Sequence, residues 1–484
     1  MNVRPIVYAL AAASVLTGCS LAPVYKVPVV DVPDSYKESG PWQPAAPADQ
    51  RERGDWWQDY GDSTLDDLEA RVDSANPDLA AALDRYAQSR AYAAETRAGL
   101  FPQVDAAAAA THNRQSDKRP LRSASQPDEY KDNLIGAQLG YELDLWGRVR
   151  NLVAAGEATA QASAADLASV RLSLHAELAN DYIALRGLDA QAKLLDDTVA
   201  TYAKALDLTR NRFRGGAASG LDVARAQTQL DTARAQATDV QARRALLEHA
   251  VATLVGTPAS KFSLPVQVVE LSEPAIPAGL PSTLLERRPD IAAAERRTAA
   301  ANANVGIARA AFFPSITLTA VGGFENTGGA DWLSAPNAFW SIGPRAFLTL
   351  FDAGRREARV NQARAALDEA GERYRATALV AFQQVEDDLA LMHLLGEEAK
   401  SEEAAAASAQ RTLILALDRY RNGAVSYLEV VESQTAALQA QRTLLSLRDR
   451  ELQASVGLIR ALGGGWAPDE ASGNSPAVAS TAGQ

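Results

Sequence analysis

The sequence predicts a mainly α-helical protein with a smaller β part, built from two copies of one unit. The first observation is an internal repeat, in which residues 147–256 align with residues 354–463 at a constant offset of 207. The second is a long proline-free stretch in each copy, with apolar residues spaced as on one face of a helix. The third is a pair of segments before each stretch in which apolar and polar residues alternate, as in a β-strand. Two long copies differ from a solenoid of many short repeats and indicate a pseudo-twofold chain.

Composition and charge narrow the class of protein. Aromatic residues make up only 6% of the 484 residues, which favours long helices over a compact mixed core. The formal net charge of −12 disfavours a nucleic-acid partner, because the phosphate backbone selects basic surfaces.

Residues 1–18 have the features of an export signal, with Arg4 followed by an apolar run that ends in small residues. The sequence LTGC at 16–19 resembles a bacterial lipobox, so we expect cleavage before Cys19 and lipidation of Cys19. An ordinary signal peptide followed by a stray cysteine is the alternative. Ser20 stands where lipoproteins of the inner membrane usually have Asp, which favours anchoring in the lipid of the outer membrane.

The first copy follows an extended, proline-rich arm at 19–61. Residues 62–256 form this copy, with a helix over 62–100, a β-hairpin at 103–146 and a helical hairpin at 147–256. The helix that opens the helical hairpin could reach about 100 Å before a glycine ends it.

The second copy repeats that order after a linker at 257–283. Residues 284–463 contain a helix, a β-hairpin at 315–353, with its return strand from about 339 to 351, and a helical hairpin at 354–463. A disordered tail is expected at 464–484.

The predicted strands have a length that suits a tilted membrane strand, and aromatic residues such as Trp146, Phe313 and Trp340 bracket them. A soluble sheet packed on helices is the alternative. Four strands cannot close a membrane barrel, and an open edge is not tolerated in lipid. Membrane-spanning strands would therefore require several chains to share one barrel, and three chains would supply twelve strands.

Several motifs along the chain resemble one family. These are YELDLWGR (141–148), LLERRPDIAAAER (284–296), ARAAFFPSI (308–316), LFDAGRR (350–356), the lipobox, and the paired turn motifs RFRGGAASGLDVARAQT (212–228) and RYRNGAVSYLEVVESQT (419–435). Together they resemble the TolC-like outer-membrane efflux proteins, in the lipidated branch that serves resistance-nodulation-division (RND) pumps. The resemblance covers nearly everything from Cys19 to Gly463.

This resemblance implies a fold, a location and a set of partners. The fold is a homotrimer with a twelve-stranded β-barrel in the outer membrane and a long α-helical barrel in the periplasm. The function is a passive exit duct for substrates delivered by an inner-membrane RND transporter and a periplasmic adaptor. The alternatives are a structural coiled-coil lipoprotein without a pore and the exit duct of a one-step (type I) protein exporter. The transported substrate, the particular adaptor and pump, and the resting width of the aperture are not encoded in recognisable motifs.

No constellation of residues indicates catalysis, a cofactor or a metal site. The four histidines, His112, His175, His249 and His393, are widely separated, and no glycine-rich phosphate loop or nucleophile elbow is present. We therefore expect a protein that is not an enzyme.

The candidate site lies just after the second glycine turn. Glu429 and Glu432 are three residues apart, so they share one helix face, and three chains would place six carboxylates around one axis. The alternative is an ordinary solvated acidic face. The resemblance implies that these two residues form the periplasmic aperture and that Tyr420 and Asp222 form a gate latch. Val425 stands where the family has an arginine that makes a second latch, so that latch is absent or replaced here.

The turns of both helical hairpins are expected at the periplasmic tips. Glycine permits the left-handed backbone that ends a helix, and serine can cap the returning helix. Turn chemistry alone would explain these residues, and the resemblance adds docking of an adaptor hairpin. The residues concerned are Gly216, Ala217, Ser219, Gly423, Ala424 and Ser426.

Overall fold

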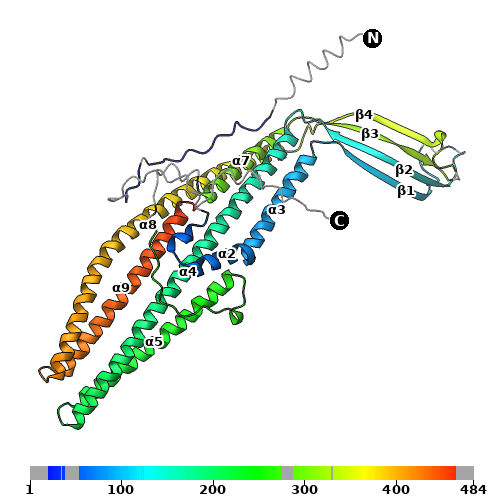
Figure 1. The fold of residues 1–484 in the computed structure, drawn as a ribbon. Coiled ribbons are helices and arrows are strands. Elements are labelled where there is room, and N and C mark those ends of the chain that lie inside the picture. Colours follow the sequence, from blue (N-terminus) through cyan, green and yellow to red (C-terminus); the bar gives the residue numbers. More distant parts are fainter. Residues whose placement is uncertain are drawn as a thin grey trace, which may run out of the picture. The chain divides into compact units, whose positions relative to one another are not determined.

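The computed structural model describes residues 20–33, 35–38, 54–120, 123, 125–274, 276, 287–328 and 331–464. The predicted signal peptide, Cys19 and the tail beyond Gly464 lie outside the described residues. The described chain is mainly helical with four strands, which confirms the predicted fold class. In chain order the elements are η2 (Trp56–Tyr60), α2 (Ser63–Ala75), α3 (Pro77–Ala98), β1 (Gln103–Arg114), β2 (Glu129–Glu142), α4 (Arg148–Arg214), α5 (Gly220–Leu254), η3 (Ala259–Lys261), α7 (Pro289–Ala310), β3 (Ser315–Asn326), η4 (Ala335–Asn337), β4 (Ala338–Phe347), α8 (Arg355–Arg421) and α9 (Tyr427–Ala461) (Figure 1).

The chain divides into two compact units. The first contains residues 86–163 and 294–374 with the described N-terminal residues up to 29, and therefore holds all four strands. The second contains residues 30–85, 164–293 and 375–464 of the described chain. It holds both turns of the long helical hairpins.

The four strands form one antiparallel sheet in the order β1-β2-β3-β4 (Figure 1). The two predicted β-hairpins therefore lie side by side, joined by the pairing of β2 with β3. Gly136 pairs with Gly323 at this junction, and a Cβ on Gly323 would lie 2.3 Å from the carbonyl oxygen of Ile135. Glycine is required there because the two backbones approach more closely than any side chain allows.

The strand bounds differ from the sequence expectation at β4. The expected return strand continues to about residue 351, whereas β4 ends at Phe347. The following residues turn into α8, where Asp352 accepts a hydrogen bond from the backbone N–H of Arg356 at 3.2 Å. The apolar residues Leu348, Leu350 and Phe351 lie exposed in the connection between β4 and α8.

The described start of the chain lies on the first unit. The backbone carbonyl of Pro23 accepts a hydrogen bond from the Asn302 amide at 2.9 Å, and that of Leu21 accepts one from Arg309 at 3.2 Å. The Tyr25 hydroxyl donates to the carboxylate of Glu295. These contacts hold the segment just after Cys19 along α7.

Each copy of the repeat supplies a helical hairpin of the same dimensions. The outgoing helices α4 and α8 each contain 67 residues, and the returning helices α5 and α9 each contain 35. At 1.5 Å per residue the longer helices extend about 100 Å.

The helix expected over 62–100 is divided at Asn76 and Pro77, because Pro77 begins a new helix. The Asn76 carboxamide oxygen caps α3 by accepting hydrogen bonds from the backbone N–H groups of Asp78 and Leu79. Its amide nitrogen donates to the carbonyl of Leu254 at 2.8 Å, which ties this corner to the end of α5.

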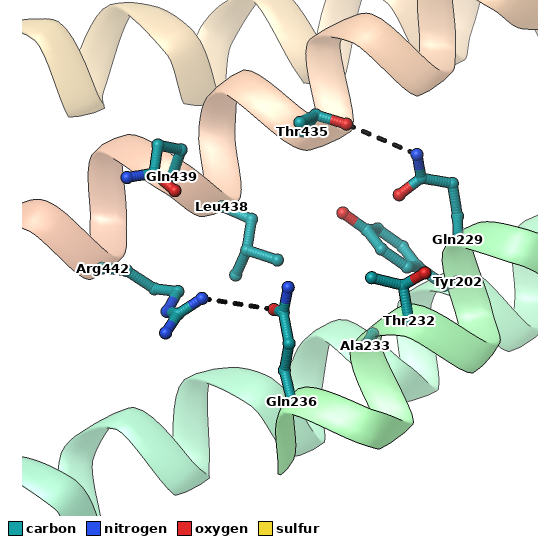
Figure 2. A pocket seen from close by; sticks show the side chains of 9 residues that line it. All are labelled: Tyr202, Gln229, Thr232, Ala233, Gln236, Thr435, Leu438, Gln439 and Arg442. Atoms are coloured by element: carbon teal, nitrogen blue, oxygen red, sulfur yellow. Dashed lines mark hydrogen bonds between the residues drawn. The ribbon is translucent and has the colours of Figure 1, made fainter. Parts of the chain in front are cut away.

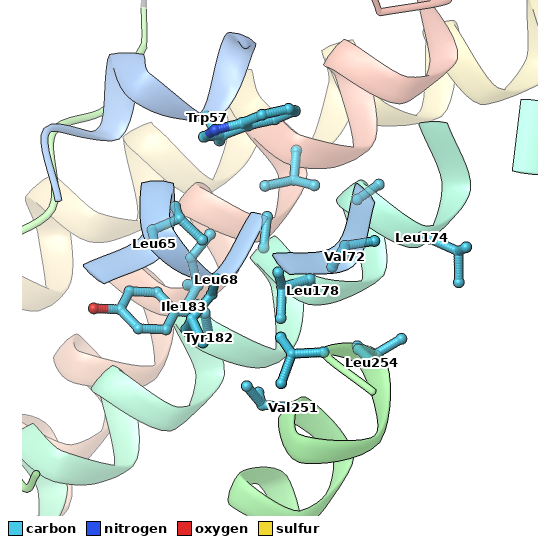
Figure 3. Close-up of a cluster of buried hydrophobic side chains, with 14 of the residues drawn as sticks. Trp57, Leu65, Leu68, Val72, Leu174, Leu178, Tyr182, Ile183, Val251 and Leu254 are labelled. Atoms are coloured by element: carbon cyan, nitrogen blue, oxygen red, sulfur yellow. The ribbon is translucent and has the colours of Figure 1, made fainter. Parts of the chain in front are cut away.

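The largest hydrophobic cluster of the second unit joins α2 to the middle of α4 and the end of α5 (Figure 3). Leu65 and Val72 of α2 are fully buried. Burial of side chains of this size contributes about 1.5–3 kcal/mol each. The cluster includes Trp57, Leu65, Leu68, Val72, Leu174, Leu178, Tyr182, Ile183, Val251 and Leu254.

Candidate functional site

The predicted site residues gather at the turns of the two helical hairpins, both in the second unit. We call residues 212–225 the first turn and residues 419–432 the second turn. They are equivalent under the 207-residue repeat.

The two turns close with the same backbone geometry. In the first, Ala217 N–H donates to the carbonyl of Arg212 at 2.8 Å, and Gly216 N–H donates to that of Phe213 at 3.0 Å. Ala424 and Gly423 repeat these bonds in the second turn at 2.9 and 3.0 Å. This is the Schellman closure of a helix end, which needs a left-handed residue after the helix.

Glycine provides that left-handed residue in both turns. Gly216 and Gly423 have φ angles of 74° and 75°. The predicted tip residues, Gly216, Ala217, Ser219, Gly423, Ala424 and Ser426, are all exposed.

Different residues start the two returning helices. Ser219 and Asp222 form a capping box, in which the Ser219 hydroxyl accepts from the Asp222 N–H and the Asp222 carboxylate accepts from the Ser219 N–H. Ser426 makes no side-chain cap bond, although its backbone has the extended conformation of a cap. The carboxylate of Asp222 is therefore used locally, and the carboxylate of its repeat equivalent, Glu429, is not.

The second turn has an acidic face without basic partners. Glu429 and Glu432 are exposed, and within the described part of the chain neither carboxylate makes an ion pair or hydrogen bond. In the first turn the equivalents of these residues are Asp222 and Arg225, which approach each other at 4.0 Å. The exchange of Arg225 for Glu432 thus turns a balanced pair into two like charges on one helix face.

Tyr420 lies in a small core between the turns. It is buried, its ring meets that of Tyr427 edge to face at 5.2 Å, and its hydroxyl lies 3.4 Å from the Thr209 hydroxyl, to which it donates. The described residues include no hydrogen bond between Tyr420 and Asp222. Within one chain, each member of the predicted latch has a different partner.

Sequence reasoning missed Tyr427. Its side chain is 1% exposed, and its pKa is raised mainly by burial, with smaller contributions from Tyr420, Tyr202 and the negative charge of Asp222. Asp222 therefore lies near Tyr427 rather than bonding to Tyr420. A comparison of the two copies could have identified it, because the repeat equivalent of Tyr427 is Gly220. Only the second turn has a large side chain to bury at this position.

Arg212 is the second residue that sequence reasoning missed. Its guanidinium lies 4.6 Å from the centre of the Tyr420 ring and donates to the backbone carbonyls of Tyr420 and Arg421 at the end of α8. It thereby links the first turn to the second. A cation over an aromatic ring and at a helix C-terminus is favourable on both counts.

Beyond these turns the two hairpins meet through polar side chains around a cavity of about 160 Å³ (Figure 2). Gln229 of α5 donates to Thr435 of α9, and Arg442 of α9 donates to Gln236 of α5, both at 3.4 Å. Figure 2 shows these side chains pointing across the space between the helices. Long hydrogen bonds around a cavity give a weaker seam than close apolar packing.

Of the histidines, His175 is buried and has the most elaborate surroundings. Its ring stacks on Trp57 at 4.5 Å and its nitrogens lie 2.6 Å from Glu69 and 3.2 Å from Asp73. Burial raises the pKa of Glu69 to about 7. The cluster fastens α2 to α4, and among the described residues no group of three or more His, Cys, Asp or Glu is arranged to hold a metal ion.

Comparison with known proteins agrees with this geometry. The profile of the family described as "Outer membrane efflux protein" matches residues 70–257 and 280–464. The chain is 34% identical over 480 residues to the probable efflux pump outer membrane protein TtgC of Pseudomonas putida, covering 97% of each chain. It is 30% identical over 460 residues to the cation efflux system protein CusC of Escherichia coli, covering 94% of this chain and 97% of that protein.

A solved structure shows the same fold. The CmeC outer membrane channel of Campylobacter jejuni superposes with a TM-score of 0.87 at 25% identity, covering 94% of this chain and 97% of that chain. No described helix is long and apolar enough to cross a membrane. The predicted alternative of a coiled-coil lipoprotein without a channel is wrong, because the repeats, the four strands and both hairpins match channel proteins throughout. The chain belongs to the outer membrane efflux protein family, whose members are channels rather than enzymes, with a periplasmic helical part.

Proposed function

We propose that three copies of this chain form the exit duct of a tripartite efflux system, with an inner-membrane RND transporter and a periplasmic adaptor as partners. The three sheets would join edge to edge into one closed sheet of twelve strands. The four strands of one chain leave both β1 and β4 with an unpaired edge, which supports such sharing. The role in an efflux system is supported by relatives whose names refer to efflux.

The observation that carries the aperture is the pair of exposed, unpaired carboxylates on the second turn. Three copies of Glu429 and Glu432 around a shared axis would give a ring of negative charge. Such a ring attracts cations and repels anions at a constriction. The first turn cannot supply it, since Asp222 caps its helix and Arg225 balances its charge.

Planar bilayer recordings test the aperture. Glu429→Gln combined with Glu432→Gln should lower the cation-to-anion permeability ratio several-fold. The matched control is Glu402→Gln combined with Glu403→Gln on α8, which removes the same charge about 28 Å from the end of that helix. Equal selectivity in the two double variants would contradict the aperture assignment.

The gate latch is proposed for the closed, assembled duct. For Tyr420 to donate to Asp222, the Tyr420 hydroxyl must leave Thr209 and approach the carboxylate oxygen of Asp222 that Ser219 does not use. Closure would draw the turns together and form this bond, while opening would return Tyr420 to Thr209, as in the single chain. The polar seam around Gln229 and Arg442 is where the hairpins would slide. Tyr420→Phe should raise the closed-state conductance, and an unchanged conductance would remove the latch.

Lipidation of Cys19 and docking of an adaptor are proposed with the same function. The contacts of residues 21–25 with α7 would place the start of the chain beside the first unit, where an anchor in outer-membrane lipid is useful. The exposed tips, such as Gly216 and Gly423, would receive the adaptor. Radiolabelled palmitate should label the wild-type protein but not Cys19→Ser. Cysteine cross-linking from position 217 or 424 should capture the adaptor.

A further inference from the structure

The contact of Arg212 with the second turn joins the two copies of the repeat within one chain. Arg212 belongs to copy one, and its guanidinium reaches groups of copy two: the Tyr420 ring and the carbonyls of Tyr420 and Arg421. These carbonyls end α8, where backbone acceptors lack partners inside the helix. The contact therefore satisfies a helix end and places a cation over a buried ring.

The equivalent contact is missing in the single chain, although all of its groups are present. The repeat equivalent of Arg212 is Arg419, and those of Tyr420 and Arg421 are Phe213 and Arg214. Arg419 is exposed, and its guanidinium makes no hydrogen bond or ion pair with any described residue. Phe213 is 50% exposed, whereas Tyr420 is 3% exposed.

The residues next to the Arg212 contact and their repeat equivalents next to Arg419 differ in a matched way. The Tyr420 hydroxyl donates to Thr209, and the repeat equivalent of Thr209 is Ala416. Phe213 lacks the hydroxyl and Ala416 lacks the acceptor, so the second contact requires no polar partner at this point. The ring, the cation and the helix end are all that remain, and all three are exposed.

We propose that Arg419 of one chain packs on Phe213 of the next chain and caps its α4 by donating to the carbonyls of Phe213 and Arg214. This rests on the trimer of the proposed function. In a ring of three chains the hairpins of copies one and two alternate, so each second turn has a first turn on both sides. One neighbour belongs to the same chain and is held by Arg212. The other belongs to the next chain and is held by Arg419.

The proposed contact has a specific role at the gate. It would make the spacing between chains equal to the spacing within a chain, so that the six turns form an even ring. Val425, the neighbouring residue of the second turn, has no polar group with which to make such a tie between chains.

A cysteine pair tests the contact. Phe213→Cys combined with Arg419→Cys, treated with a short thiol-reactive cross-linker, should convert most of the single-chain band on a denaturing gel into two-chain and three-chain bands. The matched control is Arg212→Cys combined with Tyr420→Cys, which should cross-link within one chain and leave the mass of the band unchanged. The wild-type chain, with its single cysteine, is the blank.

The outcomes separate this inference from the proposed function. A trimer seen by native mass spectrometry that yields no two-chain bands would overturn the Arg419 contact alone. A monomer would overturn both. If the double variant fails to fold, a photo-reactive amino acid at position 419 of the otherwise wild-type chain provides the second measurement. Its adduct should map to the peptide that contains Phe213 of another chain, and an adduct elsewhere would contradict the contact.

Discussion

The two hairpin turns have the same backbone closure and opposite chemistry at their surfaces. The first turn uses its charges locally, since Asp222 caps α5 and lies beside Arg225. The second turn buries two aromatic rings and leaves Glu429 and Glu432 unpaired. The two copies thus share the fold of the turn and differ in how their charges are used. The comparison teaches that repeat equivalents with different side chains are the places to look for a functional difference between the copies.

The largest difference should appear at the first residue of the returning helices. Tyr427→Ala removes a ring that is 1% exposed and should cost about 3–5 kcal/mol of stability in the second turn. Its equivalent change, Gly220→Ala, adds a Cβ that meets only the Phe213 ring at 3.8 Å, so it should be neutral or stabilise by up to about 1 kcal/mol. Hydrogen exchange of the turn amides measures both. Similar effects of the two variants would remove the distinction between the turns.

The next effect concerns Asp181 and Asp388, two equivalent carboxyl groups at which the copies agree. Burial raises the pKa of each from 3.8 to about 6, with Glu177 adding to the shift at Asp181 and Arg460 opposing it at Asp388. Because the pKa in the folded chain lies above the unfolded value, the folded chain binds these protons more tightly. Their stabilising contribution to the free energy of unfolding is complete below about pH 4 and is lost as the pH rises through 6.

The difference between a pKa of 3.8 and one of about 6 corresponds to about 3 kcal/mol of folding free energy, and solvent screening at these partly exposed groups leaves about 1 kcal/mol each. Denaturant unfolding of the detergent-solubilised protein between pH 4 and 7 measures this loss. Asp181→Asn and Asp388→Asn should each remove about 1 kcal/mol of this loss, while buried Glu69, whose pKa is also raised, contributes separately. If neither variant changes how the unfolding free energy depends on pH, that dependence comes from other groups.

Asp222 and its repeat equivalent Glu429 should then separate stability from ion selectivity. Asp222→Ala removes the capping box and the partner of Arg225, and should cost about 1 kcal/mol of stability with little effect on ion selectivity. Glu429→Ala removes no cap bond and should leave stability unchanged while lowering cation selectivity. Thermal unfolding and bilayer recordings on the same two variants measure this. A loss of stability in Glu429→Ala would show that its carboxylate is used locally after all.

The fold was largely predictable because its helices follow from sequence patterns that depend on neighbouring residues and extend over many turns. Apolar residues at helical spacing over 67 residues predict α4 and α8, and glycine marks their ends at Gly216 and Gly423. The division at Asn76 was harder to see, since the amide of Asn76 caps one helix and also reaches the end of another. That second contact depends on tertiary structure.

The candidate site was predictable only in part. Glu429 and Glu432 follow from spacing on one helix face and lie exposed as expected, although their role remains a prediction. Arg212 was missed because its contact crosses from one copy to the other, whereas alignment of the copies emphasises what they share. Tyr427 was missed because its burial against the Tyr420 ring depends on tertiary packing. Arg212 contacts Tyr420, which follows Arg419, the repeat equivalent of Arg212. Such a contact between distant residues leaves no pattern in the nearby sequence.

The smallest effect tests whether the charge difference alone distinguishes the turns. Glu432→Arg gives the second turn the same residue type that Arg225 provides in the first, three residues after an acid. A pair at this spacing on an exposed helix adds about 0.2–0.5 kcal/mol, so stability should hardly change. The net charge of the face changes from −2 to zero, so three chains together change by six charge units. Cation selectivity should therefore fall further than in Glu432→Gln, which removes three. If both variants lower it equally, the loss of the Glu432 carboxylate matters and the added positive charge does not. If neither variant lowers it, Glu432 does not contribute to the selectivity, and the exchange of arginine for glutamate between the copies has no effect on conduction.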